Sequence, residues 1–569
     1  MSKASNIIGI HCTGILSSAC LISKGKLVYG CSEERFSRIK NDSNFPILTI
    51  KHILKKFKLK LNDIDTFAIG WNSGENISSR FRAKYSTFER YPGDFLSAVP
   101  NYLTTLIENK KINQSSISFL GDFKSKITFV DHHLSHARLA LEESKLEDAL
   151  VLSTDAWGET KCTVIYEFKK NKLKTLNKVY FPNSIGCFYG AITNFLGFKP
   201  LHDEWKVMGM AAYGNHNNVN KNFFDIVKLL PNGEYQLDLK FFDFYNYETK
   251  NWYSDQIIKI LGQPRNKKDK ILKRHYDIAA AGQKLFTNVM DHIIKYYFKK
   301  TTSKNIILTG GCAMNSLYNG RLQNLKLFNK SKISFSPNDT GNSIGSAIEV
   351  NKQLNPNQKI KNISSFIGDS FKKEEIKKEL DLYKIKYSEL SETQMLKSIS
   401  NILIQDKVIG LFIGKSEFGQ RALGSRSIIA SPRNKIMKEI VNKKIKYREP
   451  FRPFAPVIKI DDLKKIFDVS SEEPVMHMEK ALKFREKFKK ICPAVVHKDG
   501  TGRVQTVNKN SFFYKLINNF ESLTNCPVLL NTSFNLNNEP MVHTPKDAIR
   551  TFYSSGMDCL VLENFLIEK

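Results

Sequence analysis

Hydrophobic and polar positions alternate in two similar stretches of the chain. Residues 6–34 read as three short strands separated by turns, with a Lys-Gly-Lys turn at residues 24–26. Residues 149–181 repeat the pattern, with a turn at residues 170–172. Apolar and polar residues that alternate with a period of two predict strands, and the turn residues between them predict hairpins. Two strand–turn–strand units of this kind predict a duplicated α/β core.

Helical periodicity follows each of these units. Residues 47–57 and the longer stretch 277–300 carry apolar side chains at helical spacing. A short apolar run at residues 305–309 comes next and ends in two glycines. This order of elements predicts strands that alternate with helices, as in α/β proteins.

A second α/β domain is predicted beyond a polar, irregular stretch at residues 351–363, which reads as a linker. The segment 408–414 is apolar and predicts a strand, and 432–445 predicts a helix. Two further strands are predicted at 527–533 and 558–567. We therefore place domains at residues 1–355 and 362–569.

Length and composition agree with a folded protein of about two domains. The chain has 569 residues, 41% of them hydrophobic, which is enough for large buried cores. Its longest apolar runs are shorter than the roughly 20 residues of a membrane span, and its start has no secretory apolar segment. The nine cysteines include no C-x-x-C pair. We expect a cytoplasmic protein without a membrane partner, disulfide framework or structural zinc.

The net charge of +31 suits either a nucleic acid or small anionic substrates. A bias toward lysine in the genome would give the same balance with no functional meaning. No Lys/Arg block with interleaved aromatic residues stands out, so the sequence does not favour a nucleic-acid partner.

Two histidines one helical turn apart form the first candidate site. His132 and His136 share a helix face, so both imidazoles can bind one metal ion. Asp339, at a strand–loop–helix boundary, is the best carboxylate ligand, and Asp155, at the end of a predicted strand, is the next. This donor set suits Fe(II), Mn(II) or Zn(II), and we predict Fe(II). The alternative is an ordinary histidine pair on the surface or in the core.

Glycines mark a candidate nucleotide site. Gly310 and Gly311 follow a predicted strand, where backbone amides can approach a phosphate. Glu204 and Lys206 precede a run of glycine and alanine that favours close packing around a ligand. The alternatives are a structural turn and a tightly packed buried loop.

Arginines dominate a candidate anion site in the second domain. They stand among glycine, proline, phenylalanine and alanine instead of in Lys/Glu runs, at Arg421, Arg426, Arg448, Arg452 and Arg503. Such arginines bind phosphate or carboxylate in bidentate fashion. The segment Asn531–Asn535 adds amide and hydroxyl groups for the same anion. The alternative is a solvated charged face.

An ordered set of motifs along nearly the whole chain resembles the NodU/CmcH carbamoyltransferase family, which includes tobramycin, cephem and Nod-factor O-carbamoyltransferases. The motifs are SEERFSRIK, DHHLSHA, DAWGE, SIGCFYGAITNFLGF, DEWKVMGMAAYG, GGCAMN, EFGQRALGSRSIIASPR, REPFRPFAP, PVLLNTSFN and NEPMVHTPKDAI. The resemblance implies an actin-like N-terminal domain joined to a YrdC-like C-terminal domain. It also implies a homodimer.

The resemblance implies an ATP-dependent O-carbamoyltransferase. Carbamoyl phosphate and ATP, the latter with Mg, would yield carbamoyl-adenylate in the second domain, and the first domain would transfer the carbamoyl group to a hydroxyl of a sugar or natural product. His132, His136, Asp155 and Asp339 would hold the metal, and Gly310, Gly311 and Asn315 would contact the adenylate with Lys206 nearby. Carbamoyl phosphate and ATP would be bound by Arg421, Lys446, Arg448, Arg503, Asn531 and Ser533.

One departure from the family pattern falls in the first predicted hairpin. Many members have His-Asp there, whereas this chain has Ile15 and Leu16. His11 and Cys12 lie close by in sequence. This departure leaves open a nucleotide-binding protein without catalytic activity. The net charge of +31 and the similarity of both halves to threonylcarbamoylation factors leave open a tRNA-modifying protein.

Overall fold

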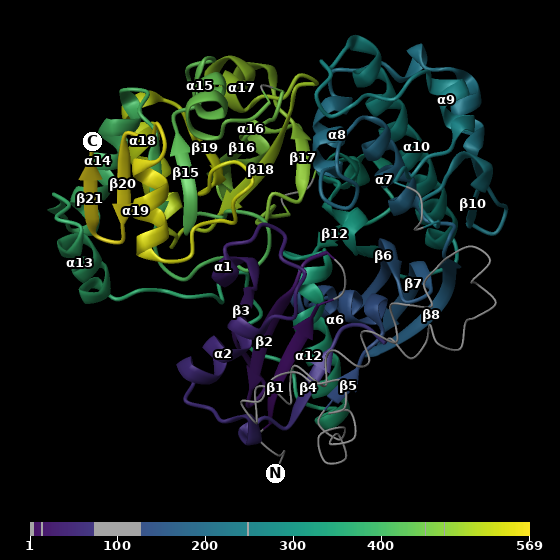
Figure 1. Ribbon diagram of the computed structural model, residues 1–569, viewed down its shortest axis with the longest axis horizontal. Helices are drawn as coiled ribbons and strands as arrows, with labels where there is room; N and C mark the ends of the chain where they lie inside the picture. Colours follow the sequence, from purple (N-terminus) through teal and green to yellow (C-terminus); the bar gives the residue numbers. More distant parts are fainter. Residues whose placement is uncertain (1–4, 13–14, 73–126, 247–249, 450, 471–472) are drawn as a thin grey trace. The chain divides into compact units, whose positions relative to one another are not determined.

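The computed structural model describes residues 5–12, 15–72, 127–246, 250–449, 451–470 and 473–569 (Figure 1). The chain divides into two compact units. The first unit comprises residues 1–33, 41–315 and 326–364, and the second comprises residues 34–40, 316–325 and 365–569. Two short segments from the earlier part of the sequence therefore belong to the second unit.

The first unit opens with a five-stranded sheet in the order β3-β2-β1-β4-β5. β1 pairs antiparallel with β2 and parallel with β4, and β4 pairs parallel with β5. The helix α2 (Ile47–Lys56) connects β3 to β4. The strands are β1 (Asn6–His11), β2 (Ser18–Ser23), β3 (Lys26–Ser32), β4 (Thr66–Ile69) and β5 (Ile127–Phe129).

A second five-stranded sheet repeats this topology in the order β12-β11-β6-β7-β8. β6, β7 and β8 form an antiparallel meander, and β11 pairs parallel with both β6 and β12. The same strand arrangement in both sheets confirms the predicted duplicated, actin-like α/β architecture. The strands are β6 (Asp148–Gly158), β7 (Lys161–Lys169), β8 (Lys172–Tyr180), β11 (Asn305–Thr309) and β12 (Lys330–Ile333).

Two helices in close contact, α6 (His132–Ser144) and α12 (Asn342–Leu354), pack between these sheets (Figure 1). α12 lies on β1, β2 and β4, whereas α6 lies on β6 and β11. Glycines permit the close approach. A Cβ atom at Gly345 would lie 1.8 Å from the carbonyl oxygen of Ser135, and one at Gly9 would lie 1.8 Å from that of Ser343. The N-terminal ends of α6 and α12 are therefore fixed next to each other.

The rest of the first unit is mainly helical. The long helix α10 contacts α7 and α8, and a small hairpin pairs β9 with β10. The elements are α7 (Ile185–Phe195), α8 (Glu204–Ala211), β9 (Val227–Leu229), β10 (Tyr235–Leu237), α9 (Asp255–Leu261) and α10 (Lys273–Phe298).

The second unit is built on a nine-stranded mixed sheet, which confirms a second α/β fold. Its order is β13-β21-β20-β14-β15-β19-β16-β18-β17. β14 pairs parallel with β20 and β16 with β18. The strands are β13 (Ser388–Glu389), β14 (Ile409–Phe412), β15 (Arg426–Ala430), β16 (Ala455–Lys459), β17 (Lys480–Lys483), β18 (Thr501–Val507), β19 (Val528–Ser533), β20 (Cys559–Leu562) and β21 (Phe565–Glu568).

Helices pack on this sheet around one continuous apolar core. The helix predicted at 432–445 is shorter than expected, because α15 ends at Ile440 and a π-helical turn, Val441–Ile445, follows. The helices are α13 (Lys373–Leu382), α14 (Glu392–Ile404), α15 (Met437–Ile440), α16 (Leu463–Ile466), α17 (Glu486–Ile491), α18 (Phe512–Thr524) and α19 (Pro545–Tyr553). No helix among the described residues is long and apolar enough to cross a membrane.

The two early segments complete this second unit. Residues 34–40 contain α1 (Glu34–Ser37), after which Arg38 donates hydrogen bonds to the carbonyl oxygens of Met541, at 2.7 Å, and Pro540, at 3.1 Å. Residues 316–325 contain α11 (Ser316–Arg321), which packs against β17. A Cβ atom at Gly320 would lie 1.9 Å from the carbonyl oxygen of Ala481.

Candidate functional site

The first turn of α6 presents two buried imidazoles on one face. Asp131 caps the helix, because its side chain accepts a hydrogen bond from the backbone N–H of Leu134 at 2.8 Å. Glu159 accepts another from the N–H of His132 at 3.0 Å. The Nε2 atoms of His132 and His136 consequently lie only 3.1 Å apart. His133, on the same turn, contacts Ser153 and the backbone of Lys161 instead.

Asp155 reaches these imidazoles from a bulge in β6. The register between β6 and β7 shifts between Thr154 and Gly158, which takes Asp155 out of the regular ladder. Its Oδ2 atom lies 3.1 Å from Nε2 of His136 and 3.6 Å from Nε2 of His132.

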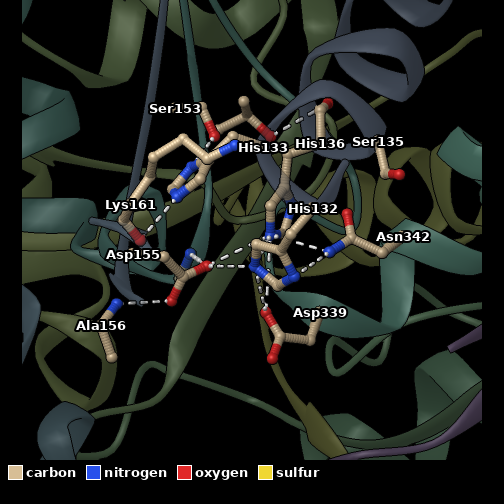
Figure 2. Close-up of polar contacts among 12 residues, drawn as sticks. His132, His133, Ser135, His136, Ser153, Asp155, Ala156, Lys161, Asp339 and Asn342 are labelled. Atoms are coloured by element: carbon tan, nitrogen blue, oxygen red, sulfur yellow. Dashed lines mark hydrogen bonds and ion pairs between the residues drawn. The ribbon is translucent and has the colours of Figure 1, made fainter. Parts of the chain in front are cut away.

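Asp339 approaches from the short turn before α12. Its Oδ1 atom lies 3.6 Å from Nε2 of His132 and 3.5 Å from Nε2 of His136. One donor atom from each of the four residues lies within 4.8 Å of every other (Figure 2). We call His132, His136, Asp155 and Asp339 the histidine–aspartate cluster.

Charges in this cluster hold the donors together. Burial would lower the pKa of His136, but the carboxylates of Asp155 and Asp339 outweigh it and raise that pKa to about 9. Burial is likewise outweighed at Asp155, where the two imidazoles hold the pKa of the carboxyl well below its usual range. The carboxylate of Asp155 is therefore negative at neutral pH.

The same donors fit a divalent cation. Two Nε2 atoms 3.1 Å apart cannot both be protonated, and one shared proton leaves the two carboxylates incompletely neutralised. Donors about 2 Å from a common ion would themselves be separated by about 3 to 4 Å. The spacing, the burial and the mixed nitrogen and oxygen donors suit zinc or another first-row transition metal.

The predicted glycine loop lies against this cluster. Gly310 has φ +86°, and a Cβ atom there would lie 2.2 Å from the carbonyl oxygen of Thr154. The N–H of Gly311 donates to Oδ2 of Asp155 at 2.8 Å. The glycines are therefore required for close packing on β6, and they join the loop directly to Asp155.

Asn315 and Lys206 lie elsewhere in the first unit. Nδ2 of Asn315 donates to Oε1 of Gln283 on α10 at 2.9 Å, and the hydroxyl of Tyr189 donates to the same oxygen at 2.9 Å. Lys206 is on α8, where its ammonium pairs with Asp203 at 2.9 Å and faces the ring of Phe198.

Three further residues contact the cluster, of which the sequence pointed only to His11, as a neighbour of the departure at Ile15 and Leu16. Asn342 donates toward both imidazoles, and Glu159 anchors the backbone of His132. Nε2 of His11, at the end of β1, lies 3.6 Å from Oδ2 of Asp339. The spacing of Asn342 was the available signal, since it follows Asp339 by three residues at a predicted helix start.

In the second unit, basic side chains gather with few carboxylates. We call Arg421, Lys446, Arg448 and Arg503 the cationic cluster. Lys446 is 2% exposed, and its ammonium donates to Ser533 and to the carbonyl and side-chain oxygens of Asn535. Burial and the charges of Arg448 and Arg452 lower the pKa of Lys446 well below its usual value.

The three arginines of this cluster are partly exposed, and the charges of Arg421 and Arg448 repel that of Arg503. Burial and the charges of Arg421 and Arg448 lower the pKa of Arg503, although a guanidinium keeps its charge at neutral pH. Nε of Arg503 and Nη2 of Arg448 are buried and have no hydrogen-bond partner among the described residues. These donors are suited to an anion.

Two polar residues of β19 adjoin the cationic cluster. Nδ2 of Asn531 donates to the carbonyl oxygen of Ala422 at 3.1 Å and to Gln505 at 2.8 Å. Its Oδ1 atom is buried without a donor in the part of the chain that the structure describes. The hydroxyl of Ser533 donates to Asn535 at 2.7 Å.

Arg426, which the sequence grouped with the anion-binding arginines, has a different role. Its guanidinium donates to the carbonyl oxygens of Ile413, at 3.0 Å, and Asp369, at 3.0 Å, and it lies 3.6 Å from the centre of the Phe412 ring. It is fully buried in the fold. Backbone carbonyls occupy both of its terminal amino groups, so Arg426 differs from the partly exposed arginines of the cationic cluster, with which the sequence grouped it.

Comparison with known proteins covers both units. The family described as carbamoyltransferase N-terminus matches residues 6–348, and that described as carbamoyltransferase C-terminus matches residues 400–569. The nodulation protein NolNO of Sinorhizobium fredii is 29% identical over 583 residues, which span 97% of this chain and 78% of that protein. The uncharacterized protein sll1178 of Synechocystis sp. is 33% identical over an alignment of 597 positions, which covers 99% of this chain and 97% of that protein. The chain belongs to the carbamoyltransferase family.

Proposed function

We propose that this carbamoyltransferase activates carbamoyl phosphate with ATP and then transfers the carbamoyl group to a hydroxyl of a sugar or natural product. We assign transfer to residues 1–355 and activation to residues 362–569, with residues 34–40 completing the second unit. The observation that carries the proposal is that one chain of this family holds two sites that suit ligands of opposite charge. The histidine–aspartate cluster calls for a cation, and the cationic cluster calls for an anion.

In the activation step, the cationic cluster would bind the phosphates of carbamoyl phosphate and ATP. Water hydrolyses carbamoyl phosphate to inorganic phosphate and carbamate, and a carbamate oxygen then attacks the α-phosphorus of ATP and displaces pyrophosphate. Arg503 and Arg448 have unpartnered N–H groups for the phosphate oxygens. The unpartnered Oδ1 of Asn531 is an acceptor for the amide N–H of the carbamoyl group. Carbamoyl-adenylate is the product of this step.

In the transfer step, the acceptor oxygen forms a bond to the carbamoyl carbon, AMP leaves, and the hydroxyl proton is released. His132, His136, Asp155 and Asp339 would hold the metal, for which we propose Fe(II), and the metal would supply Lewis acidity toward the carbamoyl oxygen. Gly310, Gly311 and Asn315, with Lys206, would position the adenylate. Because the N–H of Gly311 donates a hydrogen bond to Asp155, a nucleotide held by this glycine loop would lie next to one of the proposed metal ligands.

Pyrophosphate release tests this proposal. Purified protein should release pyrophosphate only when carbamoyl phosphate and ATP are both present, and labelled carbamoyl phosphate should label an acceptor from a panel of sugars. Protein that releases no pyrophosphate from both substrates, at any Mg concentration, would refute the activation step. Pyrophosphate release without labelling of any hydroxyl compound would refute the proposed acceptor class.

A further inference from the structure

Asn342 lies between the two imidazoles of the histidine–aspartate cluster. It is the first residue of α12 and is fully buried. Its Nδ2 atom lies 3.1 Å from Nδ1 of His132 and 3.1 Å from Nε2 of His136 (Figure 2). Its Oδ1 atom is buried and has no hydrogen-bond partner among the described residues. An amide is thus placed so that one end contacts both rings while the other end is unpartnered.

This arrangement conflicts with metal binding by His132. Nε2 of His132 faces the two carboxylates, so binding a cation there requires its lone pair and places the ring proton on Nδ1. The N–H of Nδ1 would then face the NH₂ group of Asn342 at 3.1 Å, with two donors and no acceptor. A half turn of the amide group would replace that NH₂ with Oδ1, which can accept the hydrogen bond from Nδ1–H of His132.

The backbone around Asn342 is tightly packed, so rotation of the side-chain amide is the available way to remove this conflict. A Cβ atom at Gly70 would lie 2.9 Å from the carbonyl oxygen of Asn342, so β4 packs directly against this residue. α12 is pressed against β1 at Gly9 and against α6 at Gly345. Because these contacts involve backbone atoms, α12 cannot move without displacing its neighbours.

We propose that Asn342 is a positioning residue of the metal centre, whose amide oxygen accepts the Nδ1–H of His132 when a metal is bound. This contact selects the tautomer of His132 that leaves Nε2 available as a ligand. The inference rests on the proposed metal site. It adds a side-chain amide as the acceptor that orients His132. In metal sites this acceptor is commonly a carboxylate or a backbone carbonyl.

Titration with Co²⁺ of the full-length protein tests the role of Asn342. Affinity is measured by competition with a chromogenic chelator, and the visible spectrum of bound Co²⁺ reports ligand geometry. Asn342→Leu keeps the volume but removes the acceptor, and should weaken Co²⁺ binding about 10- to 100-fold and alter the spectrum. Asn342→Asp restores an acceptor and should bind Co²⁺ at least as tightly as the unaltered protein.

Asn351→Leu provides the matched control. Asn351 is on the same helix and fully buried, and its side-chain amide has no partner among the described residues. Its substitution should leave Co²⁺ affinity unchanged. Equal affinities of Asn342→Leu and the unaltered protein would overturn the proposal, as would equal losses in Asn342→Asp and Asn342→Leu or in Asn351→Leu. Unaltered protein that binds no Co²⁺ would instead refute the metal centre itself.

Discussion

The histidine–aspartate cluster and the cationic cluster differ in how their buried charges interact. In the first, Asp155 and Asp339 attract a protonated imidazole, so the cluster is held together before a metal arrives. In the second, Arg503 is repelled by Arg421 and Arg448. The comparison indicates that one site is organised by its own charges, whereas the other depends on its ligand to offset repulsion.

The hydrogen bonds support the same distinction. Asp155 accepts backbone bonds from Ala156 and Gly311 at 2.8 Å each, which fix its carboxylate. In the cationic cluster, Lys446 is fixed by Ser533 and Asn535, but N–H groups of the arginines are unpartnered. A substitution in one cluster should therefore impair that cluster and leave the other unaffected.

Loss of a metal ligand should give the largest effect. Asp339→Ala should abolish stoichiometric metal binding and lower carbamoyl transfer about 1000-fold or more, because several kcal/mol of metal stabilisation are lost. Pyrophosphate release should continue. Metal analysis and the two assays check this, and a parallel fall in pyrophosphate release would contradict the separation of the sites.

Loss of a buried cation should give the next largest effect. Lys446→Met removes a charged donor worth about 1.5 to 3 kcal/mol and should slow pyrophosphate release about 10- to 100-fold. Metal content should stay at the level of the unaltered protein. Pyrophosphate release that is unchanged would show that the cationic cluster does not bind the activating substrates.

The pH dependence of anion binding should be smaller, at most tenfold per pH unit. The unbound protein has a lowered pKa at Lys446, and a bound anion stabilises the protonated form, so binding takes up a proton. The contribution of Lys446 to pyrophosphate affinity should therefore be complete below that lowered pKa and be lost as pH rises through it. Calorimetric titration measures this, and Lys446→Arg should flatten the profile. A profile of equal slope in Lys446→Arg would assign the proton to another group.

Stabilisation by an anion should be the smallest effect. Pyrophosphate at ten times its dissociation constant adds about 1.4 kcal/mol to the stability of the second unit, or roughly 3 to 6 °C in its melting temperature. Differential scanning calorimetry should resolve this shift, and Arg503→Met should reduce it. An equal shift in the melting of the first unit would indicate a general salt effect.

Much of the fold and of the histidine–aspartate cluster could be predicted because the sequence signals for them are local. Repeated hairpins gave the duplicated sheets, and the four-residue spacing of His132 and His136 gave their shared face. Asp155 ends a predicted strand and Asp339 lies in the loop between a strand and a helix, where side chains gather at one edge of a sheet. These four residues converge as expected.

Other features depend on contacts between distant residues. The two terminal amino groups of Arg426 donate to backbone carbonyls such as those of Ile413 and Asp369, which no composition or spacing reveals. Asn342 reads as a helix-start residue, and its position between two imidazoles depends on how α6 and α12 pack. The assignment of residues 34–40 and 316–325 to the second unit likewise follows from tertiary contacts alone.

The early segment that holds Arg38 has a consequence for biosynthesis. Arg38 lies 3.6 Å from Asp547 and donates to the carbonyl oxygen of Met541, so these partners leave the ribosome about 500 residues later. At a usual synthesis rate of about 5 to 20 residues per second, this delay is roughly 25 to 100 s. The nascent chain must keep residues 34–40 accessible for that time, and the second unit reaches its final form only after residues 541–547 have been synthesised.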